Sequence, residues 1–177
     1  MNEGKGSYLH QVLQRHIFEL LPKGEAFIEY RLPGHIADVC WLSKKIIFEI
    51  QVSPISIDIA VSRTEDYRKM GFHIVWILHQ KSFNSTYLTL SELYFRKQKT
   101  CYFTNISSSG TGYIYDQNDQ FRNNKREIRG EALIIHLNNP LLTCSKLFFA
   151  GDRNDLSLIS ILTKSLQLCY TTIQKFF

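Results

Sequence analysis

Two apolar runs separated by a short polar break constrain the fold of this chain more than any other feature. Residues 35–42 read HIADVCWL, residues 45–52 read KIIFEIQV, and Ser43-Lys44 lies between them. Both runs are rich in β-branched and aromatic residues, and a polar turn between two such runs predicts a β-hairpin. The sequence therefore predicts a sheet in which these two strands are neighbours.

The flanking segments add two helices and two more strands. Residues 7–21 and 56–70 carry apolar side chains at helical spacing, and each segment opens on a serine that can cap a helix. Residues 26–32 (AFIEYRL) read as a strand, and the continuous apolar run at 72–78 (FHIVWIL) is typical of a strand covered on both faces. The first eighty residues thus predict the element order α-β-β-β-α-β.

The second half of the chain predicts less regular elements. We expect a helix near 88–97, strands at 101–105 and 111–117, a polar and basic segment at 117–130, a strand or helix at 131–137, and a helix over 155–177. We expect residues 81–177 to form a C-terminal α+β extension packed on a core of residues 1–80, so that the chain makes one compact domain.

The composition limits the compartment and the partners. A net charge of +5 suits an acidic partner such as nucleic acid, although many proteins with this charge bind none. The four cysteines are far apart and follow no zinc-binding spacing. With no secretory signal and no apolar run of membrane-spanning length, we expect a cytoplasmic protein without a membrane partner.

Polar side chains inside the two hairpin runs are the candidates for chemistry. Asp38, Glu49 and Gln51 lie among apolar neighbours, where a charge is costly unless it is paired or bound to a metal. If the hairpin turns at Ser43-Lys44, residues whose numbers sum to 87 face each other. Asp38 then lies opposite Glu49, with Cβ atoms roughly 5 Å apart. A divalent cation between the two carboxylates, Mg²⁺ or Mn²⁺, would relieve their repulsion.

The same residues allow a plainer interpretation. Asp38 and Glu49 could form a carboxylate pair at a solvent-facing sheet edge with no ion between them. A slip of one residue in the hairpin register would also place them on opposite faces. The register of the hairpin therefore decides whether the pair exists.

An ordered series of short motifs extends this hypothesis. The motifs are Asp38 in an Ala-Asp-Val strand, Glu49-Ile50-Gln51, Ser53-Pro54-Ile55-Ser56, Arg63 with Tyr67 four residues later, and Gly71 ahead of Trp76-Ile77-Leu78. Over about residues 7–80, this series resembles the nuclease domain of CoiA-type competence proteins, which belong to the PD-(D/E)xK nuclease superfamily.

The resemblance implies a restriction-endonuclease-like α/β core, with a mixed sheet flanked by helices. It implies that Asp38 and Glu49 bind Mg²⁺ or Mn²⁺, and that Gln51 is a third catalytic residue in the place usually held by lysine. Arg63 and Tyr67 would support the site, although Arg63 could instead form a structural ion pair with Glu49 or Asp66. The implied activity is metal-dependent hydrolysis of DNA phosphodiesters during natural transformation.

The chain also departs from the family pattern. No cysteine-rich zinc element precedes the core, His10 follows leucine instead of glutamate, and Gln14 stands where a lysine is expected. These departures leave two alternatives open: a degenerate nuclease fold that only holds DNA, and an interaction protein that assembles through its C-terminal helix.

Further residues have both a functional and an ordinary interpretation. Glu29 could add a third carboxylate to the metal site or be a solvated strand residue, and His10 could support the site or lie on the surface. The Ile159–Phe176 stripe could form a homodimer seam or dock within the chain. A basic group could contact DNA phosphates or form a solvated loop; it comprises Arg122, Lys125, Arg126 and Arg129.

Overall fold

The computed structural model describes residues 7–98 and 100–137 of the chain. The chain divides into compact units of residues 1–147 and 148–177, and the second unit lies outside the described residues. The predicted helix at 155–177 and the Ile159–Phe176 stripe lie there too, so the homodimer through that stripe stays a prediction. Within the described residues, no helix is both long and apolar enough to span a membrane.

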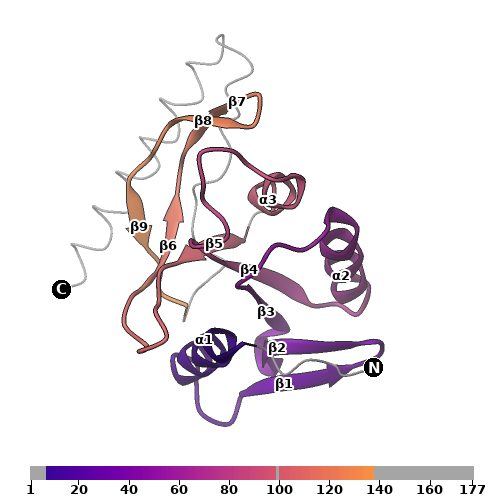
Figure 1. Cartoon of the computed structure of the whole chain (residues 1–177). Coiled ribbons are helices and arrows are strands. Elements are labelled where there is room, and N and C mark those ends of the chain that lie inside the picture. The colour runs from indigo at the N-terminus through magenta and orange to yellow at the C-terminus, as the bar shows by residue number, and fades with distance from the viewer. Residues whose placement is uncertain (1–6, 99, 138–177) are drawn as a thin grey trace, which may run out of the picture. The chain divides into compact units, whose positions relative to one another are not determined.

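A mixed sheet of seven strands organises the described residues, in the order β1-β2-β3-β4-β5-β6-β9 (Figure 1). Its three central strands run parallel to one another, and the outer pairs are antiparallel. The strands are β1 (Ala26–Leu32), β2 (His35–Trp41), β3 (Ile46–Gln51), β4 (His73–His79), β5 (Cys101–Thr104), β6 (Ile114–Gln117) and β9 (Ala132–Ile134). This arrangement confirms the predicted α/β class and the order of the first six elements.

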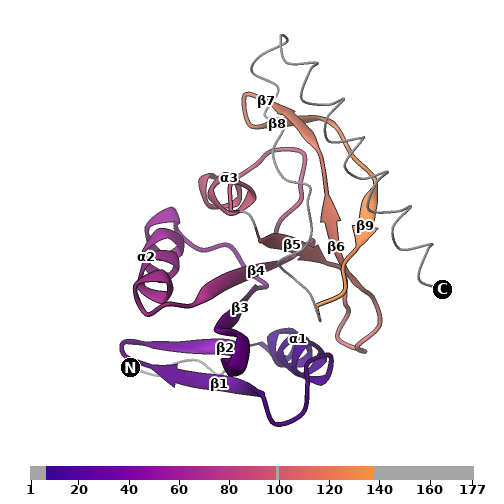
Figure 2. The ribbon, with the colours of Figure 1, turned by 180° about the vertical axis from the view of Figure 1, so that it is seen from behind.

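Helices cover both faces of the sheet, as the alternative views in Figures 1 and 2 show. Helix α1 (Tyr8–Glu19) packs on β1, β2 and β3, while α2 (Ile57–Lys69) packs on β4 and on α3 (Leu90–Arg96). Ser7 and Ser56 accept hydrogen bonds from the backbone amides three residues later, so both predicted helix caps are confirmed. Two separate hydrophobic clusters result, one on each face of the sheet.

The β2–β3 hairpin has the predicted register. Val39 pairs with Phe48 and Trp41 with Ile46, and the turn is a short 3₁₀ segment (Leu42–Lys44) that ends at left-handed Lys45. The regular pairing runs from the turn to Val39 and does not include Asp38, the next residue away from the turn. The two strands therefore part at the position where the sequence predicts the carboxylate pair.

Strand β1 rotates about its own axis at Glu29, which has a φ of 51°. Glu29 is left out of the β1–β2 ladder, although its neighbours pair in constant register on both sides. Ala26 packs in the cluster beneath α1, whereas Tyr30 packs against the cluster on the α2 face, although regular alternation would put both on one face. The change of face at Glu29 lies beside Asp38, which falls opposite it in the same register.

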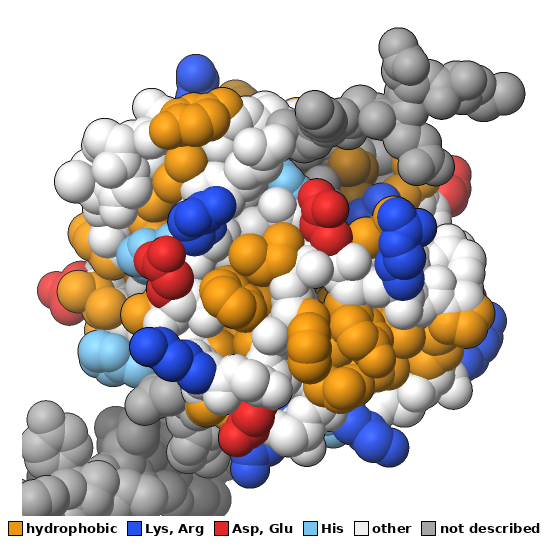
Figure 3. Space-filling view, turned by 90° about the horizontal axis from the view of Figure 1, so that it is seen from below, with side chains coloured by type: hydrophobic (Ala, Val, Ile, Leu, Met, Phe, Trp, Pro, Cys, Tyr) orange, Lys and Arg blue, Asp and Glu red, His pale blue; other side chains and the backbone are white. Residues whose placement is uncertain are grey.

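The surface around edge strand β1 mixes apolar and charged side chains. Phe27, Ile28 and Ile36 are all exposed. Figure 3, which views the molecule from the β1 side, shows hydrophobic groups there with single charged side chains scattered among them.

Beyond residue 80 the chain continues the same sheet, because β5 pairs in parallel with β4. The helix predicted near 88–97, the strands at 101–105 and 111–117, and the strand option at 131–137 correspond to α3, β5, β6 and β9. The polar segment at 117–130 gave no sign of regular structure, yet it forms a small hairpin of β7 (Gln120–Arg122) and β8 (Lys125–Ile128). Its turn residues Asn123 and Asn124 both have positive φ, which asparagine tolerates well.

Candidate functional site

Asp38 bridges the gap where β2 and β3 part. Its Oδ2 accepts a hydrogen bond of 2.7 Å from the backbone amide of Ile50, the neighbour of Glu49. A side-chain carboxylate thus satisfies a β3 amide beyond the end of the regular ladder. This contact brings Asp38 beside Glu49, as the predicted register required.

Helix α1 holds the other side of the Asp38 carboxylate. His10 Nε2 lies 3.1 Å from Oδ2, and Gln14 Nε2 donates to Oδ1 at 3.3 Å. Residues four apart on a helix share a face, which explains why both reach one carboxylate. His10 therefore lies at the site and is not an ordinary surface histidine. Gln14, noticed in the sequence only as a departure from a family pattern, has a contact of its own.

Glu49 is fully buried and is bound from helix α2. Arg63 Nη1 donates to Oε2 at 2.8 Å, and the Tyr67 hydroxyl donates to Oε1 at 2.8 Å. Arg63 and Tyr67 are again four residues apart, so one turn of α2 supplies both donors. Both expected supporting residues thus contact the buried carboxylate directly.

The charges of this site are not balanced. Burial, followed by the negative charge of Asp38, raises the pKa of Glu49 to about 7, although Arg63 and Tyr67 act in the opposite sense. Burial lowers the pKa of His10, but its hydrogen bond and attraction to Asp38, with the charges of Glu49 and Glu29, outweigh this, and the pKa is raised. The two carboxylates therefore favour a positively charged neighbour.

Gln51 is buried at the end of β3, two residues from Glu49 along the strand. Alternation along the strand places the two side chains on one face. Among residues 7–98 and 100–137, no hydrogen bond uses the amide group of Gln51. An amide without a protein partner at this position is available to a water molecule or a ligand.

The donor set suits a hard divalent cation in charge and in chemistry. Magnesium is commonly held by one or two carboxylates, with water and substrate phosphate completing the shell, and Asp38 and Glu49 supply two carboxylates. Within the part of the chain that the structure describes, no group of three or more His, Cys, Asp or Glu side chains is placed to hold a metal. Glu29 is exposed, and its negative charge contributes to the raised pKa of His10.

The basic group of the second half lies away from the carboxylates, in and after the β7–β8 hairpin (Figure 1). Arg122 and Lys125 are exposed, with Arg122 paired to Glu127. Arg126 is half-buried, with its side chain 6% exposed, and donates to Asp119 at 2.9 Å, while the exposed Arg129 donates to the backbone carbonyl of Asn84. The four residues thus divide into two surface cations and two that serve internal contacts.

Those internal contacts belong to a buried polar network that the sequence did not reveal. Asn84, which has a φ of 70°, donates through its side chain to Tyr115 and Gln117 and accepts from Arg96 and Arg126. These residues are separated by 12 to 42 positions in the chain. Asparagine adopts a positive φ more often than most residues do, but the sequence does not show which asparagine will do so.

Comparison with known proteins identifies one family. A sequence model described as "Competence protein CoiA, nuclease-like domain" matches residues 9–128, which is more than half of the chain. The matched range begins in α1 and ends in β8, so it includes every residue of the carboxylate site. No curated protein and no solved structure matches the chain.

Proposed function

Because this chain belongs to the family of CoiA nuclease-like domains, we propose that it hydrolyses DNA phosphodiesters with a divalent metal ion held by Asp38 and Glu49. The metal is Mg²⁺, with Mn²⁺ as the natural substitute. We assign the activity to the processing of DNA in the cytoplasm during natural transformation.

One observation carries this proposal. Glu49 is completely buried, and both burial and the neighbouring Asp38 oppose its ionisation. A buried carboxylate beside a second carboxylate is destabilising by itself, and two small or apolar residues would pack this position at lower cost. A bound divalent cation would remove this cost, because it neutralises the charges of both carboxylates.

The residues of the chain have distinct roles in such a site. When bound, the metal ion would polarise the scissile phosphate and lower the pKa of a bound water. His10 and Gln14 fix the orientation of Asp38, and Tyr67 fixes that of Glu49. Supporting hydrogen bonds of this kind commonly set the affinity of a metal site.

Gln51 and Arg63 together take over the work usually done by one lysine. The free amide oxygen of Gln51 can accept a hydrogen bond from the attacking water and orient it, but it brings no positive charge. Arg63 supplies that charge, since its guanidinium lies 2.8 Å from Glu49. A positive charge there favours the negative charge that accumulates on phosphate in the transition state.

A second candidate function is DNA binding without cleavage. It is favoured by the existing contacts of Glu49, because Arg63 and Tyr67 already occupy both carboxylate oxygens. In that case Arg63 would serve as a permanent substitute for the metal. The protein would then be a competence accessory that holds DNA.

Cleavage of labelled single- and double-stranded DNA separates the two functions. We expect cutting with Mg²⁺ or Mn²⁺ and none with EDTA. We also expect Asp38→Asn and Glu49→Gln to lose activity by a factor on the order of 10³, equivalent to about 4 kcal/mol of transition-state stabilisation. Asp58→Asn, an exposed carboxylate on α2, is the matched control and should cut normally. Binding without cleavage under every metal condition would establish the accessory role instead.

A further inference from the structure

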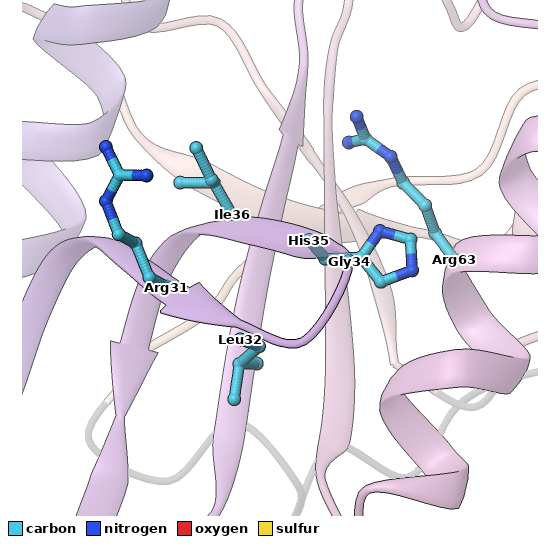
Figure 4. A pocket seen from close by; sticks show the side chains of 6 residues that line it. All are labelled: Arg31, Leu32, Gly34, His35, Ile36 and Arg63. Atoms are coloured by element: carbon cyan, nitrogen blue, oxygen red, sulfur yellow. The ribbon is translucent and has the colours of Figure 1, made fainter.

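A pocket of about 560 Å³ lies next to the carboxylate site. It is formed by the β1–β2 turn and by α2, and its lining consists of Arg31, Leu32, Gly34, His35, Ile36 and Arg63 (Figure 4). We propose that this pocket binds a backbone phosphate of the DNA strand, next to the scissile one, with Arg31 and Arg63 as its ligands. The inference rests on the proposed function for the identity of the anion.

The lining carries positive charge and no carboxylate. Two of its six residues are arginines, and the only titratable residue besides them is His35. His35 is already engaged, since its Nε2 lies 2.9 Å from Asp66. The pocket therefore offers two guanidinium groups to any anion that enters it.

Arg31 has no partner of its own. In the part of the chain that the structure describes, no hydrogen bond or ion pair engages its guanidinium. Its neighbours Tyr30 and Leu32 both pack toward the cluster on the α2 face, so Arg31 extends from the other face of β1. In Figure 4 the side chains of Arg31, Ile36 and Arg63 extend to the same side of the ribbon, with Ile36 between the two arginines.

Arg63 joins the pocket to the carboxylate site. One of its N–H groups donates to Glu49, and a guanidinium has five such donors in a fixed planar fork. Its side chain is 38% exposed, so donors remain accessible on the pocket side. Arg63 thus contacts Glu49 and also lines the pocket, so a ligand bound to Arg63 there lies close to the proposed metal ligands.

The chemistry of the lining favours a nucleic-acid phosphate over a free inorganic anion. Arginine forks match the paired oxygens of phosphate groups. Ile36, 43% exposed between the arginines, adds an apolar surface on which a sugar can pack. A volume of about 560 Å³ has room for a nucleotide unit, whereas a lone phosphate would leave most of it to water.

Binding of labelled DNA by the full chain in EDTA tests the pocket without cleavage. We expect Arg31→Ala to weaken binding about five- to tenfold. It should also reduce the slope of log Kd against log salt by about one, the amount expected for one lost phosphate contact. Arg31→Lys, which keeps the charge but loses the fork, should fall between wild type and Arg31→Ala. Arg15→Ala is the matched control, because Arg15 is exposed on α1 and does not line this pocket.

The outcomes for the pocket and for the catalytic proposal are distinct. If wild type binds DNA and Arg31→Ala behaves like Arg15→Ala in affinity and salt slope, the pocket proposal is overturned, whether or not the protein cuts. If Arg31→Ala alone weakens binding but no metal supports cleavage, the pocket stands and the nuclease proposal fails. If wild type binds no DNA even at low salt, both are overturned. Thermal melts check that Arg31, which is exposed, can be replaced without unfolding.

Discussion

Two polar clusters among the described residues combine the same residue types in opposite ways. In the carboxylate site, Asp38 and Glu49 repel each other; Arg63 contacts Glu49, and His10 contacts Asp38. In the network around Asn84, the buried acids Glu92 and Asp119 each contact at least one half-buried arginine. In the first cluster one carboxylate raises the pKa of the other, and an added cation would relieve this repulsion.

The network around Asn84 shows what a balanced buried cluster looks like. Asp119 accepts a hydrogen bond from Arg126 and forms an ion pair with Arg96 at 3.4 Å, and Glu92 accepts from Arg96 and from the backbone amide of Asn84. The Arg96 guanidinium also stacks over the Phe103 ring at 4.4 Å. This set of contacts ties the β7–β8 hairpin to α3 and to the loop before it.

The contrast separates a structural cluster from a functional one. Burial alone does not distinguish them, since Glu49 and Asp119 are both inaccessible to solvent. The sign of the neighbouring charges does distinguish them. A buried pair of like charges costs folding free energy, so its presence points to a function such as ion binding. Replacing one acid in each cluster should therefore have different consequences.

The largest expected effect on stability is in the balanced network. Asp119→Asn leaves two half-buried arginines short of a negative charge and should cost about 3–5 kcal/mol. Asp38→Asn keeps an oxygen for the Ile50 amide and relieves repulsion of Glu49, so it should change stability by less than about 1 kcal/mol. Urea denaturation of the two variants measures both values. Equal losses would mean that the carboxylate pair is structural and would remove the contrast.

The sequence predicted the elements of the first eighty residues, where the spacing of apolar residues matches the side chains that pack in the core. The apolar run of β4 and the capped, periodic α1 and α2 are specified by neighbouring residues, and so is the hairpin register that brings Asp38 to Glu49. The sequence also singled out Arg63 and Tyr67, four residues apart on α2, and both contact Glu49.

What the sequence could not supply depends on distant segments. Arg126 reads locally as one cation in a basic segment, and only the tertiary fold places it on Asp119 and Asn84. Likewise, nothing in the pattern of β1 indicates that Glu29 takes a positive φ and turns the strand. Single-residue backbone states and long-range ion pairs have no periodic signature, so pattern analysis does not detect them.

The next largest effect should come from the helix that orients Asp38. His10→Gln removes the imidazole from Asp38 Oδ2 and should lower cleavage, or the affinity for Mg²⁺, by about 10- to 100-fold. The matched control is His16→Gln, on the same helix but without a contact to either carboxylate. Cleavage rates across a Mg²⁺ titration measure the difference. Indistinguishable variants would show that α1 does not support the site.

A pH titration of stability in EDTA probes the charge imbalance directly. The pKa of Glu49 is raised from 4.5 to about 7, so the folded state holds a proton that the unfolded state releases. This contribution is present below pH 4.5 and is lost as the pH rises toward 7. Relative to Glu49→Gln, wild type should lose up to about 1.4 kcal/mol for each pH unit in this window. A difference that grows in favour of wild type as the pH rises would show that Arg63 outweighs burial.

The smallest expected effect comes from adding one positive charge to the unbalanced site. In Gln51→Lys, an ammonium would lie on the face of β3 that carries Glu49, where it competes with a metal ion for the same negative charge. Two unit charges 4 Å apart interact by about 1 kcal/mol in bulk water and more strongly near a protein, so the Mg²⁺ concentration for half-maximal cleavage should rise at least several-fold. The rate at saturating Mg²⁺ should be kept, because a lysine there also stabilises the developing charge on phosphate.

Gln120→Lys, at an exposed position of β7, controls for the change in net charge. If wild type cuts DNA and both lysine variants need the same Mg²⁺ as wild type, Gln51 does not face the metal. The division of labour between Gln51 and Arg63 would then be wrong.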